Sequence, residues 1–235
     1  MNSMENEQQL REDICEVCKM MYSRGLIVGP SGNASAKLDD NHILLTPGGL
    51  LKFKMDPDQL IIVDMDGNKV GPGTEANQDL KPTSELSMHL EIYRQRPDIK
   101  AITHAHPSNV VALSSCGIQL KPTVLTEGML FLGPIPTAEY ATPTTPELAD
   151  TLSELIVNHD AIVLPYHGAI IGGHDIWNAF AKMEVIEQLA EIQILTRLIG
   201  GDKALPRHHV ESMLALRIKY NHQLPGDSML LQDYE

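Results

Sequence analysis

Short apolar runs alternate with longer amphipathic segments along the 235 residues, and this alternation constrains the fold more than any other feature. Strands place apolar residues with a period of two and helices with a period of ~3.6, so the two kinds of segment can be distinguished. Strand-like runs cover 42–46, 59–64, 99–104, 161–164 and 169–171, and helical patterns cover 6–24, 83–96, 147–157, 175–199 and 207–220. Without an internal repeat or a change of composition between segments, this pattern predicts one α/β domain over residues 1–235.

Three stretches of the chain lack a regular pattern. Residues 28–35 are rich in glycine, serine and asparagine, which favours turns, and residues 122–146 are rich in proline, which favours short extended pieces and loops. The tail from about residue 222 is expected to be loose or to form an interface.

Charge and composition narrow the class of partner. Lysine and arginine number 18 against 31 aspartates and glutamates, which gives a net charge of −13 and excludes nucleic acid and membrane surfaces as partners. No apolar run is long enough to span a bilayer, and the acidic start does not resemble a secretory signal. With only three cysteines as well, we expect a soluble protein of the cytoplasm.

Two histidines close the predicted strand at 99–104. His104 and His106 are two positions apart, so their side chains point the same way, roughly 6–7 Å from each other. Alone, such a pair is more often one core histidine and one exposed histidine. His167 in the turn between two apolar strands and Glu85 at a helix start strengthen the metal interpretation. Three imidazoles and a carboxylate favour a catalytic transition metal, with zinc preferred over magnesium or calcium.

Five blocks of sequence, which include these four residues, carry a family resemblance. They are Gly25-Leu26 with Ser31-Gly32-Asn33-Ala34-Ser35, Thr46-Pro47-Gly48-Gly49, Thr83-Ser84-Glu85, His104-Ala105-His106 and Tyr166-His167-Gly168. In this order and at these intervals the chain resembles the class II aldolase/adducin family, and within it the zinc-dependent L-fuculose-1-phosphate aldolases. The resemblance spans nearly the whole chain. It implies a three-layer α/β/α fold with a central mixed, mostly antiparallel sheet, and a homotetramer with active sites at subunit interfaces.

The resemblance also assigns roles to residues. It implies one Zn²⁺ per subunit, held by His104, His106 and His167, with Glu85 as the base that occupies the metal when substrate is absent. It places Asn33, Gly48, Gly49, Thr83 and Ser84 around the phosphate of a small phosphorylated sugar. Glycine N–H groups and hydroxyls at a helix N-terminus suit that role, although each motif alone reads as an ordinary turn or helix cap.

The chain departs from the family pattern in the segment that serves the aldehyde half of the substrate. Fuculose phosphate aldolases use a tyrosine after the His-x-His strand, yet this chain has none between Tyr93 and Tyr140, and Leu125 falls near the expected place. The aspartate that the related ribulose-5-phosphate 4-epimerases use in this region is absent too. Glu127 is our candidate replacement, and Tyr220 resembles a second family tyrosine that closes over the aldehyde.

Three functions follow from these motifs. The favoured one is an aldolase that cleaves a ketose 1-phosphate to dihydroxyacetone phosphate and an aldehyde. The second is an enzyme on the same metal site that resembles the ribulose-5-phosphate 4-epimerases or the methylthioribulose-1-phosphate dehydratases. The third is a non-catalytic, adducin-like interaction domain, which the metal-binding histidines of this chain disfavour.

Overall fold

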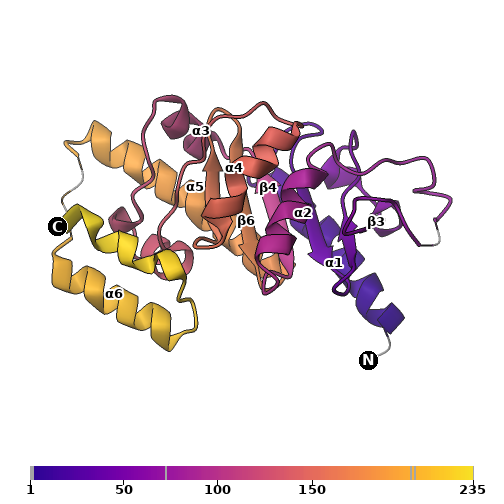
Figure 1. Cartoon of the computed structure of the whole chain (residues 1–235). Helices are drawn as coiled ribbons and strands as arrows, with labels where there is room; N and C mark the ends of the chain where they lie inside the picture. Colours follow the sequence, from indigo (N-terminus) through magenta and orange to yellow (C-terminus); the bar gives the residue numbers. More distant parts are fainter. Residues whose placement is uncertain (1–2, 72, 202, 204, 235) are drawn as a thin grey trace.

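Six antiparallel strands form the sheet at the centre of the structure (Figure 1), a computed structural model that describes residues 3–71, 73–201, 203 and 205–234. The strands are β1 (Asn33–Lys37), β2 (His42–Leu45), β3 (Ile61–Asp64), β4 (Ala101–Ala105), β5 (Ala161–Leu164) and β6 (Gly168–Gly173). Their order across the sheet is β3-β2-β1-β4-β6-β5, and each neighbouring pair is antiparallel. A parallel contact is the isolated bridge between Thr137 and Val163.

Helices cover both faces of this sheet and give the expected three layers. The face that packs on α1 (Ser3–Ser23), α3 (Ser108–Ser115) and α5 (Ile176–Leu198) forms one buried apolar cluster. The opposite face packs on α2 (Leu86–Gln95) and α4 (Pro146–Ile156) and forms a second cluster. The three-layer α/β/α fold that the family resemblance implies is therefore confirmed. Its sheet was expected to be mixed and mostly antiparallel, and the pairs between its named strands are all antiparallel.

Strand β5 shows why its sequence reads as one continuous apolar run. Ala161 and Val163 belong to the first cluster, whereas Ile162 and Leu164 belong to the second. Because successive side chains of a strand point to opposite faces, a strand buried on both sides is apolar at every position.

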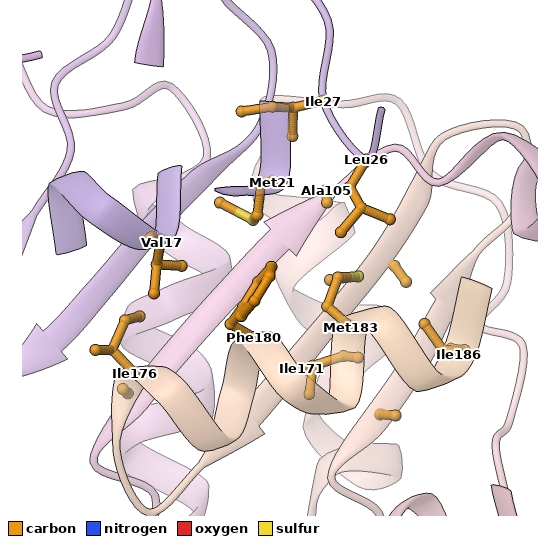
Figure 2. Close-up of a cluster of buried hydrophobic side chains, with 14 of the residues drawn as sticks. Val17, Met21, Leu26, Ile27, Ala105, Ile171, Ile176, Phe180, Met183 and Ile186 are labelled. Carbon is orange, nitrogen blue, oxygen red and sulfur yellow. The ribbon is translucent and has the colours of Figure 1, made fainter. Parts of the chain in front are cut away.

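The first cluster joins the two longest helices to the sheet (Figure 2). Val17 and Met21 of α1 lie beside Phe180 and Met183 of α5, and the set rests on Ala105 at the end of β4. All five side chains are at most 3% exposed. Burial of such side chains stabilises a fold by roughly 1.5–3 kcal/mol each, so this cluster holds β4 firmly in place.

The first strand of the sheet was missed by the sequence analysis, which expected residues 28–35 to form turns. The turns end at Gly32, and β1 begins at Asn33 and pairs with both β2 and β4. Its sequence, Asn-Ala-Ser-Ala-Lys, contains no β-branched or aromatic residue. Its position between two strands, rather than its own propensity, makes it extended.

Helix α3 was also missed, because the group that caps it is distant in the sequence. The carboxylate of Glu187 on α5 accepts hydrogen bonds from the backbone N–H groups of Asn109 and Val110 and from the Asn109 side chain. Backbone N–H groups in the first turn of a helix have no partner within the helix. A partner 77 or 78 residues away leaves no local pattern.

A smaller unit closes the chain. Helix α6 (Arg207–Lys219) and the 3₁₀ segment Pro225–Tyr234 lie at the end of the molecule opposite the N-terminus (Figure 1). Val210 of the helix and Leu230 of the segment form a third buried cluster with Met129. The tail, which we expected to be loose or interface-forming, is thus folded back over its own chain. None of the described helices combines the length and apolarity needed to cross a membrane.

Arg217 of α6 holds this unit together. Its side chain is 0% exposed, forms an ion pair with Asp227 of the tail at 2.8 Å, and donates to the carbonyl oxygens of Met129 and Leu130. One guanidinium therefore joins α6, the tail and the π-helical turn η4 (Gly128–Leu132). Gly133 suits this position, since its φ is 69° and a Cβ there would lie 2.7 Å from the guanidinium.

We expect Arg217→Met to lower the free energy of unfolding by about 3–5 kcal/mol, because the buried carboxylate of Asp227 loses its partner. Urea denaturation followed by circular dichroism measures this loss. Arg207→Met is the matched control on the same helix: its pair with Glu211 is half-exposed, and its loss costs ~0.5 kcal/mol or less. Equal midpoints for the two variants would contradict the role assigned to Arg217.

Candidate functional site

Four side chains that the sequence analysis singled out converge at one end of β4. Glu85, His104, His106 and His167 each offer a nitrogen or oxygen atom, and these atoms all lie within 4.8 Å of one another. His104 lies in β4, His106 follows it directly, His167 lies in the turn between β5 and β6, and Glu85 precedes α2. The structure therefore brings together residues that are up to 82 positions apart, the interval from Glu85 to His167.

His104 is the most constrained of these side chains. It is 0% exposed and lies on the central strand, with Asn33 of β1 opposite it on one side and Ile170 of β6 on the other. Its Nδ1 donates to the carbonyl oxygen of Ala169 at 2.9 Å. That bond leaves Nε2 directed at the cluster, which is how metal-binding histidines are commonly oriented.

The turn that carries His167 is pressed against the end of β4. A Cβ added at Gly168 would lie 2.1 Å from the carbonyl oxygen of Ala105, so only glycine permits this approach. Tyr166 on the other side of His167 has a φ of 60°, in the left-handed region that residues other than glycine rarely occupy. The backbone around His167 is thus held in an unusual conformation that directs its ring at the cluster.

The carboxylate of Glu85 bridges the imidazoles. Oε2 lies 3.1 Å from His104 Nε2, and Oε1 lies 3.1 Å from His167 Nε2. Burial favours the neutral acid, but the charge and hydrogen bonds of these imidazoles outweigh it and hold the pKa of Glu85 well below its usual range. The group is therefore an anion at neutral pH.

The donor set fits a transition-metal ion. The Nε2 atoms of His104 and His106 are only 3.1 Å apart, and Nδ1 of His104 already carries the proton that its bond to Ala169 requires. Burial, together with the charges of His104 and His167, lowers the pKa of His106 to about 3, so this ring stays neutral, as a ligand must be. Three imidazoles and one carboxylate are typical of a metal site that leaves a position open for substrate.

The loops expected to hold phosphate lie beside the same cluster. An isolated bridge pairs Pro47 with Pro82 and so brings Gly48 against Thr83, whereas a Cβ added at Gly49 would meet nothing within 4 Å. Gly49 and Ser84 are exposed, whereas the N–H of Gly48 already donates to the carbonyl oxygen of Lys81. One of the two glycine donors is therefore engaged within the chain.

Asn33 occupies a different position from the one expected of a phosphate ligand. Its side chain is buried, and Nδ2 donates to Glu85 Oε2 at 2.9 Å and to Thr83 Oγ1 at 3.3 Å. Its Oδ1 atom contacts Nε2 of His89. The side chain thus holds the carboxylate of Glu85 by a buried hydrogen bond. The sequence analysis gave His89 no partner, although its spacing of four from Glu85 along the α2 region was a usable signal.

Glu127 and Tyr220 are not brought to the metal cluster of their own chain. Glu127 is exposed just before η4, and Thr126 donates a hydrogen bond that lowers the pKa of its carboxyl group. Tyr220 follows the last turn of α6 and is half-exposed, with the ammonium group of Lys219 over its ring. Their assigned roles stay predictions.

The paired cysteines in the first helix are structural. Cys15 and Cys18 are free thiols buried in the first apolar cluster, so they contribute to the packing of the core.

Comparisons with known proteins agree with this geometry. The family model for the class II aldolase and adducin N-terminal domain matches residues 12–194. A 5-deoxy-D-ribulose 1-phosphate aldolase from Bacillus thuringiensis serovar kurstaki is 35% identical, over 88% of this chain and 94% of its own length. A 3-oxo-tetronate 4-phosphate decarboxylase from Haemophilus influenzae is 32% identical, over 77% of this chain and 85% of its own.

A solved structure agrees as well. That of an L-fuculose 1-phosphate aldolase superimposes with a TM-score of 0.80 at 28% identity, and the match covers 91% of this chain and 96% of that one. These relatives are named as aldolases and a decarboxylase, which are lyases, and the Glu/His cluster of this chain is a site that could hold a metal ion. The chain therefore belongs to the class II aldolase and adducin family.

Proposed function

We propose that this protein is a zinc-dependent aldolase that cleaves a ketose 1-phosphate to dihydroxyacetone phosphate and an aldehyde. The observation that carries the proposal is the convergence of three imidazoles and one carboxylate within 4.8 Å. An adducin-like interaction domain has no need of such a cluster. The relatives named for 5-deoxy-D-ribulose 1-phosphate and L-fuculose 1-phosphate support a ketose 1-phosphate as substrate.

Residues of this chain account for the proton transfers at the three-carbon half of the substrate. A zinc ion held by His104, His106 and His167 would supply Lewis-acid polarisation of the ketose carbonyl. When the C3–C4 bond breaks, its electron pair stays on C3, which must then gain a proton to give dihydroxyacetone phosphate. Glu85 is a buried carboxylate at the cluster and is placed to deliver that proton and to remove it in the reverse direction.

The phosphate is assigned to the exposed edge of the same site. Gly49 and Ser84 are exposed, and Ser84 lies just ahead of the first turn of α2, where helix dipoles favour anions. Thr83, which precedes Ser84 in the chain, accepts a hydrogen bond from the buried side chain of Asn33. Local donors of this kind can hold one phosphate in spite of the overall charge of −13.

The aldehyde half is assigned to a second subunit. Cleavage also requires that the C4 hydroxyl lose its proton, and Glu127 is our candidate for that step, with Tyr220 closing over the aldehyde. Both are exposed on their own chain, which suits residues that reach a neighbour's site in a homotetramer. Three free thiols suit the reducing cytoplasm, where we place the enzyme.

A decarboxylase is the second candidate, because one relative carries that name. Loss of CO₂ from a 3-oxo acid also leaves an electron pair next to a carbonyl group, so the same metal site and the same proton donor could serve.

The purified protein is expected to hold about one zinc ion per subunit, as a site with three imidazole ligands predicts. Elemental analysis of the protein measures the content. His106→Ala should reduce it severely, whereas His208→Ala, which alters an exposed histidine of α6, should not. Full zinc content in the His106 variant would contradict the assigned ligand set.

Incubation with 5-deoxy-D-ribulose 1-phosphate and with L-fuculose 1-phosphate is expected to release dihydroxyacetone phosphate from at least one of them. An NADH-coupled reduction of dihydroxyacetone phosphate measures the release, and chelation of the metal should abolish it. Release of CO₂ from 3-oxo-tetronate 4-phosphate, without cleavage of either ketose, would replace the aldolase with the decarboxylase.

Glu85→Gln is expected to lower kcat by ~100-fold or more, because an amide cannot exchange the proton at C3. Steady-state kinetics measure the loss, and zinc content should persist because the three histidines remain. The matched control is Glu91→Gln in α2, whose carboxylate accepts hydrogen bonds from Gln95 and Ser153 away from the cluster. Undiminished turnover in the Glu85 variant would exclude its role in proton transfer.

A further inference from the structure

A chain of buried hydrogen bonds leads from the carboxylate of Glu85 into the protein. Asn33 Nδ2 donates to Glu85, and Asn33 Oδ1 lies 2.5 Å from Nε2 of His89. The other ring nitrogen, Nδ1, lies 2.7 Å from Ser35 Oγ, and that hydroxyl lies 2.8 Å from the phenol of Tyr93. Asn33, Ser35, His89 and Tyr93 are each at most 2% exposed.

The chemistry of the two ends fixes the direction of every bond. The Glu85 carboxylate only accepts, so the NH₂ group of Asn33 faces it and the amide oxygen faces His89. His89 must then donate from Nε2, which leaves Nδ1 to accept from Ser35. Burial raises the pKa of Tyr93, so its phenol keeps its proton and donates to Ser35.

His89 stays neutral in this chain. Its ring is fully buried, and desolvation, with the charge of His104 as a smaller contribution, lowers its pKa to about 3. A neutral ring has one donor and one acceptor nitrogen. Asn33 Oδ1 supplies the acceptor for Nε2, and Ser35 Oγ supplies the donor for Nδ1. The alternative tautomer would set a lone pair against the oxygen of Asn33, which a buried site tolerates poorly.

The contact from Asn33 differs in kind from the other contacts of the Glu85 carboxylate. Those are made with His104 and His167, whose nitrogens belong to the metal cluster. Asn33 belongs to β1 and offers an N–H group that cannot ligate a cation. It can therefore hold the carboxylate in a fixed orientation without competing for the metal.

We propose that His89 is a positioning residue that orients Glu85 through the side-chain amide of Asn33. The proposal rests on the role of Glu85 in the proposed function. A donor at Nε2 of His89 fixes the amide with its N–H toward the carboxylate, and Ser35 and Tyr93 fix the ring that supplies this donor. Outer contacts of this kind typically change activity or metal affinity by ~10–100-fold when they are lost.

Two substitutions of His89 with side chains of similar length distinguish a role in orienting Asn33 from a role in packing alone. His89→Gln keeps an N–H donor for Asn33, whereas His89→Met fills similar space without one. We expect the glutamine variant to retain most of kcat, and the methionine variant to lose kcat by ~10-fold or more while KM changes by less than ~3-fold. If packing alone mattered, the two variants would lose kcat equally, and that result would overturn the proposal.

A second measurement needs neither metal nor turnover. Long-range ¹H–¹⁵N spectra of the metal-free, wild-type protein should show His89 protonated at Nε2 and unprotonated at Nδ1. In the methionine variant, the side-chain amide signals of Asn33 should move or broaden, and in the glutamine variant they should stay sharp. Protonation of wild-type His89 at Nδ1 would overturn the proposal even if the methionine variant fails to fold.

The two measurements also separate this proposal from the proposed function. A wild-type protein that cleaves neither ketose phosphate but shows the Nε2-protonated ring contradicts the aldolase alone. An active wild-type protein with His89 protonated at Nδ1 contradicts the positioning role alone.

Discussion

The close approach of the β5–β6 turn to the end of β4 is the contact on which the site depends. Gly168 lies so near the carbonyl of Ala105 that any side chain there would collide with it. This approach sets His167 beside His104 and His106, with ring centroids 4.8 Å from each of them. A displacement of the turn by the width of a methyl group would separate the imidazoles, so the metal site is a consequence of how two strands pack.

Much of the fold and the metal cluster could be predicted from the sequence because each rests on local spacing. A strand such as β5 is apolar at every position, and the His-x-His pair shares one side of β4 by the period of a strand. β1 and α3 could not be predicted in this way. β1 is extended because it lies between two strands, and α3 is capped by Glu187, so both depend on partners distant in the chain.

Asn33 illustrates the same limit within the site. The sequence motif Ser-Gly-Asn favours a turn, and the family resemblance places its asparagine on phosphate. In the fold, the asparagine is the first residue of β1, opposite His104, and its amide is fully engaged with Glu85, Thr83 and His89. The spacing of His89 from Glu85 hints at proximity, but its bond to Ser35 crosses from α2 to β1 and could not be predicted from local spacing.

The proposed site combines residues that are packed in the fold with residues that are exposed. An aldolase and a 3-oxo acid decarboxylase both break a carbon–carbon bond and leave the electron pair next to a carbonyl group. The groups suited to that shared step lie at the end of β4, in the β5–β6 turn and before α2. Glu85 and His104 are buried there, and His106 and His167 are partly buried. The candidates for the other product, Glu127 and Tyr220, are exposed at the ends of η4 and α6. Because substitutions at exposed positions usually cost the fold little, we expect residues there to vary between enzymes that share the proposed metal chemistry.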